Sequence, residues 1–167
     1  EDLNGRMFET FLSATMRGPA LGQFFTPRSV VEFMTFLADL SVTPSHVDRV
    51  ADLCCGTGGF LIEAMAVMTE KAQRLTMLSG GERERLVQQI RDASLYGVDA
   101  GKAPPIARIA RINMYLHGDG GSHIYFADAL DKRVHIEQGL EPELRAEREE
   151  LQRLVTNGRF RFNVALS

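Results

Sequence analysis

The chain has 167 residues, enough for one domain, and its 44% hydrophobic and 25% charged residues are an ordinary balance for a globular protein. A formal charge of −3 argues against binding of a polyanion by this segment alone, because nonspecific affinity for nucleic acid comes mainly from contacts of Lys and Arg with phosphates. No apolar stretch reaches the roughly 18 to 20 residues of a membrane helix, and the start lacks a secretory signal, so we expect a cytoplasmic protein without membrane contact.

The first 46 residues predict a helical segment. Met7, Phe8, Phe11 and Leu12 have the spacing of an amphipathic helix over residues 6–16.

A second helix is predicted after a glycine-punctuated loop. It would begin with Thr26 as N-cap and Pro27 at the first helical position, and it should end before Pro44. Its expected apolar stripe consists of Val30, Val31, Met34, Phe36 and Leu37.

From Val47 onward the pattern changes to that of strands alternating with helices. A short apolar run, Val50–Cys54, precedes a glycine turn at residues 56–59 and then an apolar run, Phe60–Met65. Strand, tight turn and helix is the economical interpretation. The polar residues 69–93 are predicted to form an insertion on the surface.

Three further strands and one helix complete the expected domain. They are a second strand Leu95–Asp99, a helix Ile106–Leu116, a third strand Ile124–Phe126 and, after a charged stretch, a fourth strand Phe160–Leu166. Alternation of this kind implies right-handed crossovers and a parallel sheet. We therefore predict an α/β, Rossmann-like domain over residues 47–167, preceded by the helical segment 1–46.

Three predicted strands end at or just before an aspartate. Asp52 closes the first strand beside the glycine turn, Asp99 closes the second, and Asp128 follows the third. Ligands of open parallel sheets bind outside the carboxyl ends of the strands. Glycines let the backbone approach a ligand, and carboxylates accept hydrogen bonds from hydroxyls and amines. Glycine turns and aspartate caps are also common for purely structural reasons, but their combination favours a nucleoside carrying positive charge.

Other cofactor sites match the sequence less well. The dinucleotide fingerprint is incomplete, because Leu61 stands where its third glycine belongs. The two cysteines, Cys54 and Cys55, are adjacent, so a bridge would close almost no loop and reduced thiols are expected. With the histidines scattered, no metal site is predicted.

Two segments resemble a known family. Residues 22–27, GQFFTP, resemble the segment that precedes the catalytic domain in gamma-class N-6 adenine DNA methyltransferases, and residues 52–61, DLCCGTGGFL, resemble their cofactor loop. Residues 113–118 and 127–130 resemble later segments of the modification subunit of type I restriction systems. The resemblance covers nearly the whole chain and is weakest over 69–93 and 131–158.

The resemblance implies a class I methyltransferase fold and a binding site for S-adenosylmethionine. Its methionine and sulfonium end would meet the first glycine loop and the preceding arm, Asp99 would accept from the ribose hydroxyls, and Asp128 with Ala129 and Ala100 would meet the adenine ring. The implied cofactor residues are Gln23, Phe25, Thr26, Asp52, Cys54, Gly56, Thr57, Gly58, Asp99, Ala100, Asp128 and Ala129.

Some features depart from the family pattern. Leu53 replaces the usual proline, and Asp99 with Ala100 replaces the more common glutamate-bearing segment. The family's catalytic motif, Asn or Asp followed by two prolines and an aromatic, would come after the fourth strand, beyond Ser167. We therefore expect no catalytic residue in this segment, weak cofactor binding and no detectable methyl transfer by it alone.

For the whole protein, the resemblance implies that it transfers a methyl group to the N-6 amine of adenine in DNA. A specificity subunit would be a partner, with a restriction subunit as a further candidate, and the uncovered edge of a sheet with four strands predicts self-association. A module that binds cofactor without catalysis, and a methyltransferase for RNA or protein, are the alternatives.

Overall fold

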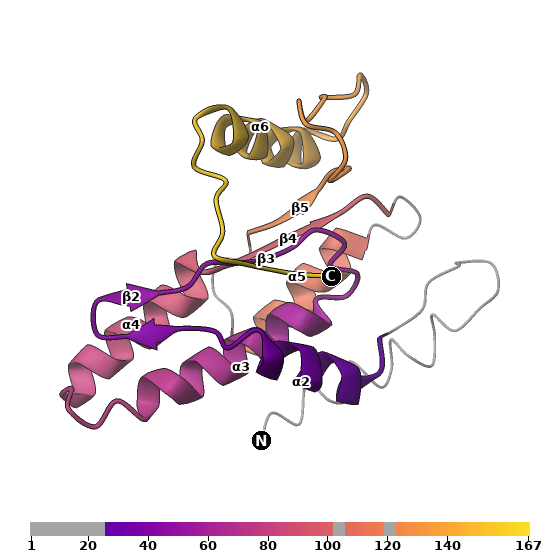
Figure 1. Cartoon of the computed structure of the whole chain (residues 1–167). Coiled ribbons are helices and arrows are strands. Elements are labelled where there is room, and N and C mark those ends of the chain that lie inside the picture. The colour runs from indigo at the N-terminus through magenta and orange to yellow at the C-terminus, as the bar shows by residue number, and fades with distance from the viewer. Residues whose placement is uncertain (1–25, 102–105, 119–122) are drawn as a thin grey trace.

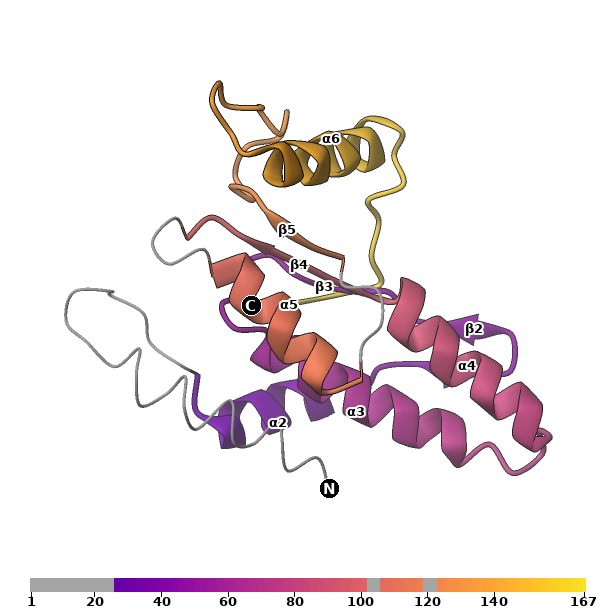
Figure 2. The same cartoon turned by 180° about the vertical axis from the view of Figure 1, so that it is seen from behind.

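The computed structural model describes residues 26–101, 106–118 and 123–167, which form a parallel sheet with helices on both faces (Figures 1 and 2). In chain order the elements are α2 (Arg28–Leu37), β1 (Val42–Thr43), β2 (His46–Val47), β3 (Val50–Asp52), α3 (Gly59–Gln73), α4 (Gly80–Ala93), β4 (Leu95–Asp99), α5 (Ile106–Leu116), β5 (His123–Phe126), α6 (Pro142–Thr156) and β6 (Val164–Leu166).

The main sheet has the order β5-β4-β3-β6, and all of its pairs are parallel. This confirms the predicted α/β class and the four strands. A second, antiparallel pair, β1 with β2, was not predicted. Each of its strands has two residues, which is too short for an alternating pattern to show in the sequence.

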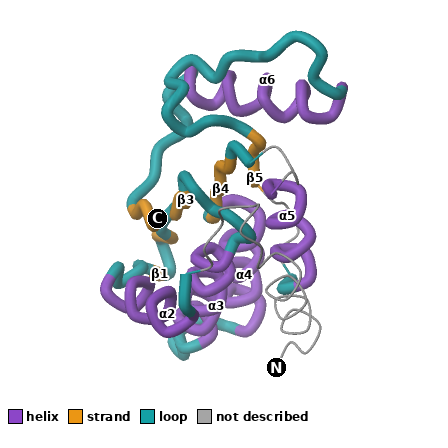
Figure 3. Tube along the Cα trace, turned by 90° about the vertical axis from the view of Figure 1, so that its right-hand side faces the viewer, coloured by secondary structure: helices purple, strands orange, loops and turns teal. Residues whose placement is uncertain are grey.

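The two faces of the sheet are covered unequally. Along β4, Leu95 packs into the core shared with α2, α3, α4 and α5, whereas Tyr96 and Val98 pack on the opposite face with Leu151 of α6. This division follows from the alternation of side chains along a strand. Among the described helices, Figure 3 shows only α6 on this face of the sheet.

Ion pairs join the helices of the two faces beside the edge strand β5. Arg108 of α5 forms an ion pair with Glu141, and Arg111 of α5 forms a bidentate ion pair with Glu147 of α6. Both side chains of the second pair are partly buried, which makes the contact stronger than an exposed pair.

The start and the apolar face of α2 differ from the prediction. Pro27, not Thr26, is the N-cap, and no side chain caps the helix. Val31 and Thr35, four residues apart, are buried, so α2 touches the core along a narrow line. Much of the predicted stripe lies outside this line. The exposed apolar residues of α2 are Val30, Phe33, Phe36 and Leu37.

Residues 69–93 do not form a surface insertion, and this prediction was wrong. The helix α3 continues to Gln73, and α4 begins with a capping box between Ser79 and Glu82. The buried apolar side chains of α4 are Leu86, Val87 and Ile90, which belong to the main core. The segment is polar in overall composition, because most other residues of α4 face solvent. Its three apolar positions were therefore not recognised as one buried face.

The helix predicted over residues 6–16 lies outside the described residues. The described end of segment 1–46 packs on the rest of the fold, since Val31 shares a core with Leu61 and Met68 of α3. The division at residue 46 stays a prediction. Among the described residues, no helix combines the length and apolar character needed to cross a membrane.

Candidate functional site

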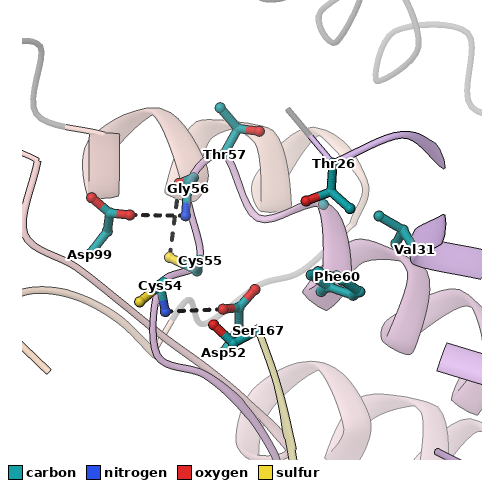
Figure 4. Close-up of a pocket in the computed structure, with 11 residues that line it drawn as sticks. Thr26, Val31, Asp52, Cys54, Cys55, Gly56, Thr57, Phe60, Asp99 and Ser167 are labelled. Atoms are coloured by element: carbon teal, nitrogen blue, oxygen red, sulfur yellow. Dashed lines mark hydrogen bonds between the residues drawn. The ribbon is translucent and has the colours of Figure 1, made fainter. Parts of the chain in front are cut away.

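A cavity of about 340 Å³ lies beyond the carboxyl ends of β3 and β4 (Figure 4). Its volume is in the range of small-molecule sites in proteins. The loop after β3 forms one wall, and the start of α2 with Phe60 of α3 forms another. The lining residues are Thr26, Val31, Asp52, Cys54, Cys55, Gly56, Thr57, Gly59, Phe60, Asp99 and Ser167.

Asp99 connects the loop after β3 to the loop after β4. Its Oδ2 accepts a 3.0 Å hydrogen bond from the backbone N–H of Gly56, and its Oδ1 accepts one of 2.8 Å from Gly101. Gly56 has a φ of +52°, and a Cβ added there would meet nothing within 4 Å. The glycine therefore serves the left-handed turn and leaves open space beside the carboxylate.

Asp52 is the buried acid of the cavity, with 1% of its surface exposed. Burial raises its pKa to about 6, the nearby charge of Asp99 adds to this rise, and the N–H of Cys54, which donates to Oδ1 over 3.1 Å, opposes it. A cation placed beside Asp52 would lower this pKa again. The carboxyl is thus suited to a positively charged ligand.

The two cysteines of the loop are free and differ in environment. Cys54 is exposed, whereas Cys55 is buried. Burial, with the charges of Asp52 and Asp99, raises the pKa of the Cys55 thiol well above its ordinary value. The backbone N–H of Cys55 donates to the carbonyl of Val98 over 3.0 Å, which ties the loop to β4. Cys55 is therefore a neutral packing residue.

The glycine loop is also held from behind by α5. The Nδ2 of Asn113, whose side chain is fully buried, donates to the carbonyl of Thr57 over 2.9 Å. Gly58, with a φ of +87°, is the N-cap of α3, and a Cβ added there would lie 3.6 Å from Cγ of Met114 in α5. The family resemblance includes Asn113 only within residues 113–118 and assigns it no role, whereas a polar side chain on an apolar helix face is the sequence signal for such a buried hydrogen bond.

Gly97 of β4 is a second residue whose role was not predicted. A Cβ at this position would lie 2.6 Å from Cδ1 of Ile124 and 3.0 Å from Sγ of Cys55. A glycine inside a strand often marks close approach of another group. Here the approaching groups are the side chain of Ile124 in β5 and that of Cys55 in the loop after β3.

The structure brings together six of the predicted cofactor residues. Those that line the cavity are Thr26, Asp52, Cys54, Gly56, Thr57 and Asp99. Thr26 faces the loop from across the cavity, as Figure 4 shows. Gln23 and Phe25 lie outside the described residues.

Four predicted residues lie elsewhere. Gly58 packs behind the loop, and Ala100 is exposed beyond β4. Asp128 and Ala129 are exposed in the segment after β5, where Asp128 borders a separate cavity of about 260 Å³. Oδ1 of Asp128 accepts from the backbone N–H of Leu130 over 2.8 Å, so this aspartate forms a local turn. In the part of the chain that the structure describes, no group of three or more His, Cys, Asp or Glu side chains is arranged to hold a metal ion.

Comparison with known proteins identifies the family. Residues 1–164 match the profile of the N-6 DNA Methylase family. The chain belongs to this family. The methylase subunit of the type I restriction enzyme EcoEI from Escherichia coli is 31% identical over 116 residues, which cover 70% of this chain and 21% of the relative.

Two further methylases support the assignment. The type II restriction enzyme and methyltransferase RM.BcgI from Heyndrickxia coagulans is 35% identical over 107 residues, 64% of this chain and 14% of the relative. In the crystal structure of a modification subunit assigned to a type I restriction enzyme from Vibrio vulnificus YJ016, 24% of that chain matches 78% of this one, with a TM-score of 0.58 and 28% identity. The chain therefore spans about a quarter or less of these relatives.

Membership of the N-6 methylase family confirms the resemblance found in the sequence, including that to modification subunits of type I systems. Enzymes of a DNA methylase family require a methyl donor. The cavity at the ends of β3 and β4 lies where ligands of open parallel sheets bind.

Proposed function

We propose that the cavity binds S-adenosylmethionine, and that the protein transfers its methyl group to the N-6 amine of adenine in DNA within a restriction-modification system. The observation that carries the proposal is the meeting of Asp52, Asp99 and the open Gly56 turn in one cavity, with Thr26 opposite. Two carboxylates and a backbone turn without side chains suit a nucleoside that carries positive charge.

Each acid has a distinct proposed role. Each carboxylate oxygen of Asp99 accepts one hydrogen bond from a backbone N–H. Since a carboxylate has about four acceptor positions, Asp99 can also accept hydrogen bonds from the ribose hydroxyls. Asp52 is buried and has a raised pKa, so it would favour the positive charge of the methionine and sulfonium end. Thr26, Cys54 and Thr57 would border that end.

The adenine end would lie toward Asp128, Ala129 and Ala100. The bound donor supplies its methyl group as an electrophile on a sulfonium. The residues of this chain therefore contribute binding and orientation, which convert transfer between two molecules into a step within one complex.

The partners of the whole protein are proposed from its relatives. The EcoEI relative is named a methylase subunit, and we propose that this protein likewise acts with DNA, a specificity subunit and a restriction subunit. The net charge of −3 agrees with DNA contacts supplied mainly by other parts of such an assembly. Methylation of cellular DNA by such a system would take place in the cytoplasm.

Calorimetry with S-adenosylmethionine tests the cavity. We expect saturable binding to this chain, and a loss of about tenfold or more in affinity for both Asp99→Ala and Asp52→Ala. Asp92→Ala, an exposed acid of α4, is the matched control and should bind like the unaltered chain. Binding that is equally strong in all four proteins would contradict the proposed site.

Transfer is tested on the complete protein. Labelled S-adenosylmethionine should deliver its methyl group to adenine in DNA, and nuclease digestion with mass spectrometry would identify the N-6 product. Label in RNA or in protein alone would reject the DNA substrate while leaving the cofactor site intact.

A further inference from the structure

The buried guanidinium of Arg148 fixes the chain where it leaves β5. Only 6% of the surface of Arg148 is exposed, although α6 is otherwise rich in exposed charges. Its Nε donates to the carbonyl of Phe126 over 2.9 Å, and its Nη1 donates to the carbonyl of His135 over 2.7 Å. The charge also lies 5.2 Å from the ring centre of Phe126 and 3.9 Å from a carboxylate oxygen of Glu137. A buried charge is tolerated only with such partners, so these groups hold one another in place.

A second side chain of α6 holds the same segment one helical turn later. Nε2 of Gln152 lies 3.2 Å from the carbonyl oxygen of Arg133 and 3.3 Å from that of Val134, and donates to both. Within the segment, Asp131 accepts from the backbone N–H of His135 over 2.6 Å. The internal turns give the segment its shape, whereas the contacts from α6 determine where it lies on the sheet.

The fixed segment adjoins the proposed cofactor site. The backbone N–H of Ala127 donates to the carbonyl of Asp99 over 3.1 Å, so the segment begins beside the proposed ribose acid. Asp128 follows directly, and Asp128 and Arg148 border the same 260 Å³ cavity. Arg148 therefore contacts the backbone on both sides of Asp128, at Phe126 and at His135.

We propose that Arg148, assisted by Gln152, is a positioning residue for the adenine end of the cofactor site. It acts through the segment of residues 127–135, which carries Asp128 and Ala129. The inference rests on the proposed function, because it assumes that these two residues meet the adenine ring.

The first measurement needs no cofactor. Arg148→Lys keeps the positive charge but replaces a planar fork with a single ammonium, which cannot reach both carbonyls in the same way. Amide hydrogen exchange of residues 127–135 should become at least about tenfold faster in this variant, and also in the milder variant Gln152→Ala. Arg153→Lys is the matched control, because Nε of Arg153 donates to the carbonyl of Glu149 within α6. This variant should leave the exchange of residues 127–135 unchanged. Unchanged exchange in folded Arg148→Lys and Gln152→Ala would overturn the proposal.

The second measurement asks whether the effect reaches the ligand. Calorimetry should show S-adenosylmethionine binding about fivefold to tenfold more weakly to Arg148→Lys. This loss should vanish in an Asp128→Ala background, because the segment then has no carboxylate to place. It should persist in full in an Asp52→Asn background, at the other end of the site. Losses that add in both backgrounds would overturn the positioning role.

The two measurements separate this inference from the proposed function. If the unaltered chain fails to bind S-adenosylmethionine while exchange still responds to Arg148→Lys, the cofactor assignment fails and the anchoring stands. If the unaltered chain binds and neither readout responds, the cofactor assignment stands and the positioning role is rejected.

Discussion

The backbone N–H of Gly56 donates to Oδ2 of Asp99 across the gap between the ends of β3 and β4. The glycine loop and the proposed ribose acid are consequently one structural unit, although 43 residues separate them in the chain. Cys55 strengthens the same connection through its bond to the carbonyl of Val98. Changes at Asp99 should therefore alter the loop as well as the ligand contact.

Asp99→Asn tests this double role. An amide has one acceptor oxygen, so its NH₂ group must face either the N–H of Gly56 or that of Gly101, and two donors then oppose each other. We expect affinity for S-adenosylmethionine to fall by about tenfold or more and the free energy of unfolding to fall by about 1 to 3 kcal/mol. Calorimetry and urea denaturation measure the two effects, with exposed Asp92→Asn as control. A normal unfolding free energy would show that Asp99 serves the ligand alone.

Asp52 should make stability depend on pH. Its folded pKa of about 6 lies above its ordinary value of 3.8, so between about pH 4 and pH 6 the folded chain binds more protons than the unfolded chain. The free energy of unfolding therefore falls as pH rises through this window, and the penalty is complete above pH 6.

Asp52→Asn removes this penalty. The quantity to compare is the unfolding free energy of the variant minus that of the unaltered chain. This difference should be roughly 1 to 3 kcal/mol larger at pH 7 than at pH 4. Urea denaturation at unit steps from pH 4 to pH 8 measures the change. A difference that stays flat with pH would mean that Asp52 titrates normally in the fold.

Asn113→Ala should loosen the glycine loop from behind. The substitution removes the donor to the carbonyl of Thr57 and leaves a small cavity beside α5. We expect a loss of about 1 to 3 kcal/mol in unfolding free energy, together with severalfold weaker binding of S-adenosylmethionine. Asn157→Ala, at the exposed end of α6, provides the control. Unfolding free energy and affinity within error of the unaltered chain would refute the positioning of the loop by Asn113.

Gly97→Ala should strain the contacts of β4 with β5 and with Cys55 of the loop after β3. The added methyl group would lie 2.6 Å from Cδ1 of Ile124, and we expect a loss of about 1 to 3 kcal/mol in unfolding free energy. Ile124→Val removes the clashing carbon and should restore part of the loss in the double variant. Gly81→Ala in α4, where the added carbon meets open space, should stabilise by about 1 kcal/mol or less. Equal effects at both glycines would reject the steric explanation.

Local patterns in the sequence were sufficient for the elements that frame the site. Leu95–Asp99 and Ile106–Leu116 were predicted with the bounds that the structure shows, because an apolar strand and an amphipathic helix each have a clear period. The glycine turn between β3 and α3 was equally clear. Parallel pairing then placed Asp52 and Asp99 in one cavity.

Other features depend on tertiary contacts that no local pattern encodes. The burial of α4 and the exposure of Phe33 and Phe36 are set by which neighbour each helix meets. Arg148 stands in a highly charged stretch, and nothing in that stretch distinguishes it from its exposed neighbours.

The ion pairs between α5 and α6 give the two margins of the sheet different capacities for β-augmentation. At β5, charged side chains from both layers flank the outer side of the strand, which disfavours docking of another chain's backbone. Within the described residues β6 pairs with β3 alone, so its second row of amides and carbonyls is the side where an additional strand would join. Such a strand would run next to Leu166, whose neighbour in β3 is Asp52. A strand that joins β6 would therefore lie one strand away from Asp52, the buried acid of the cavity.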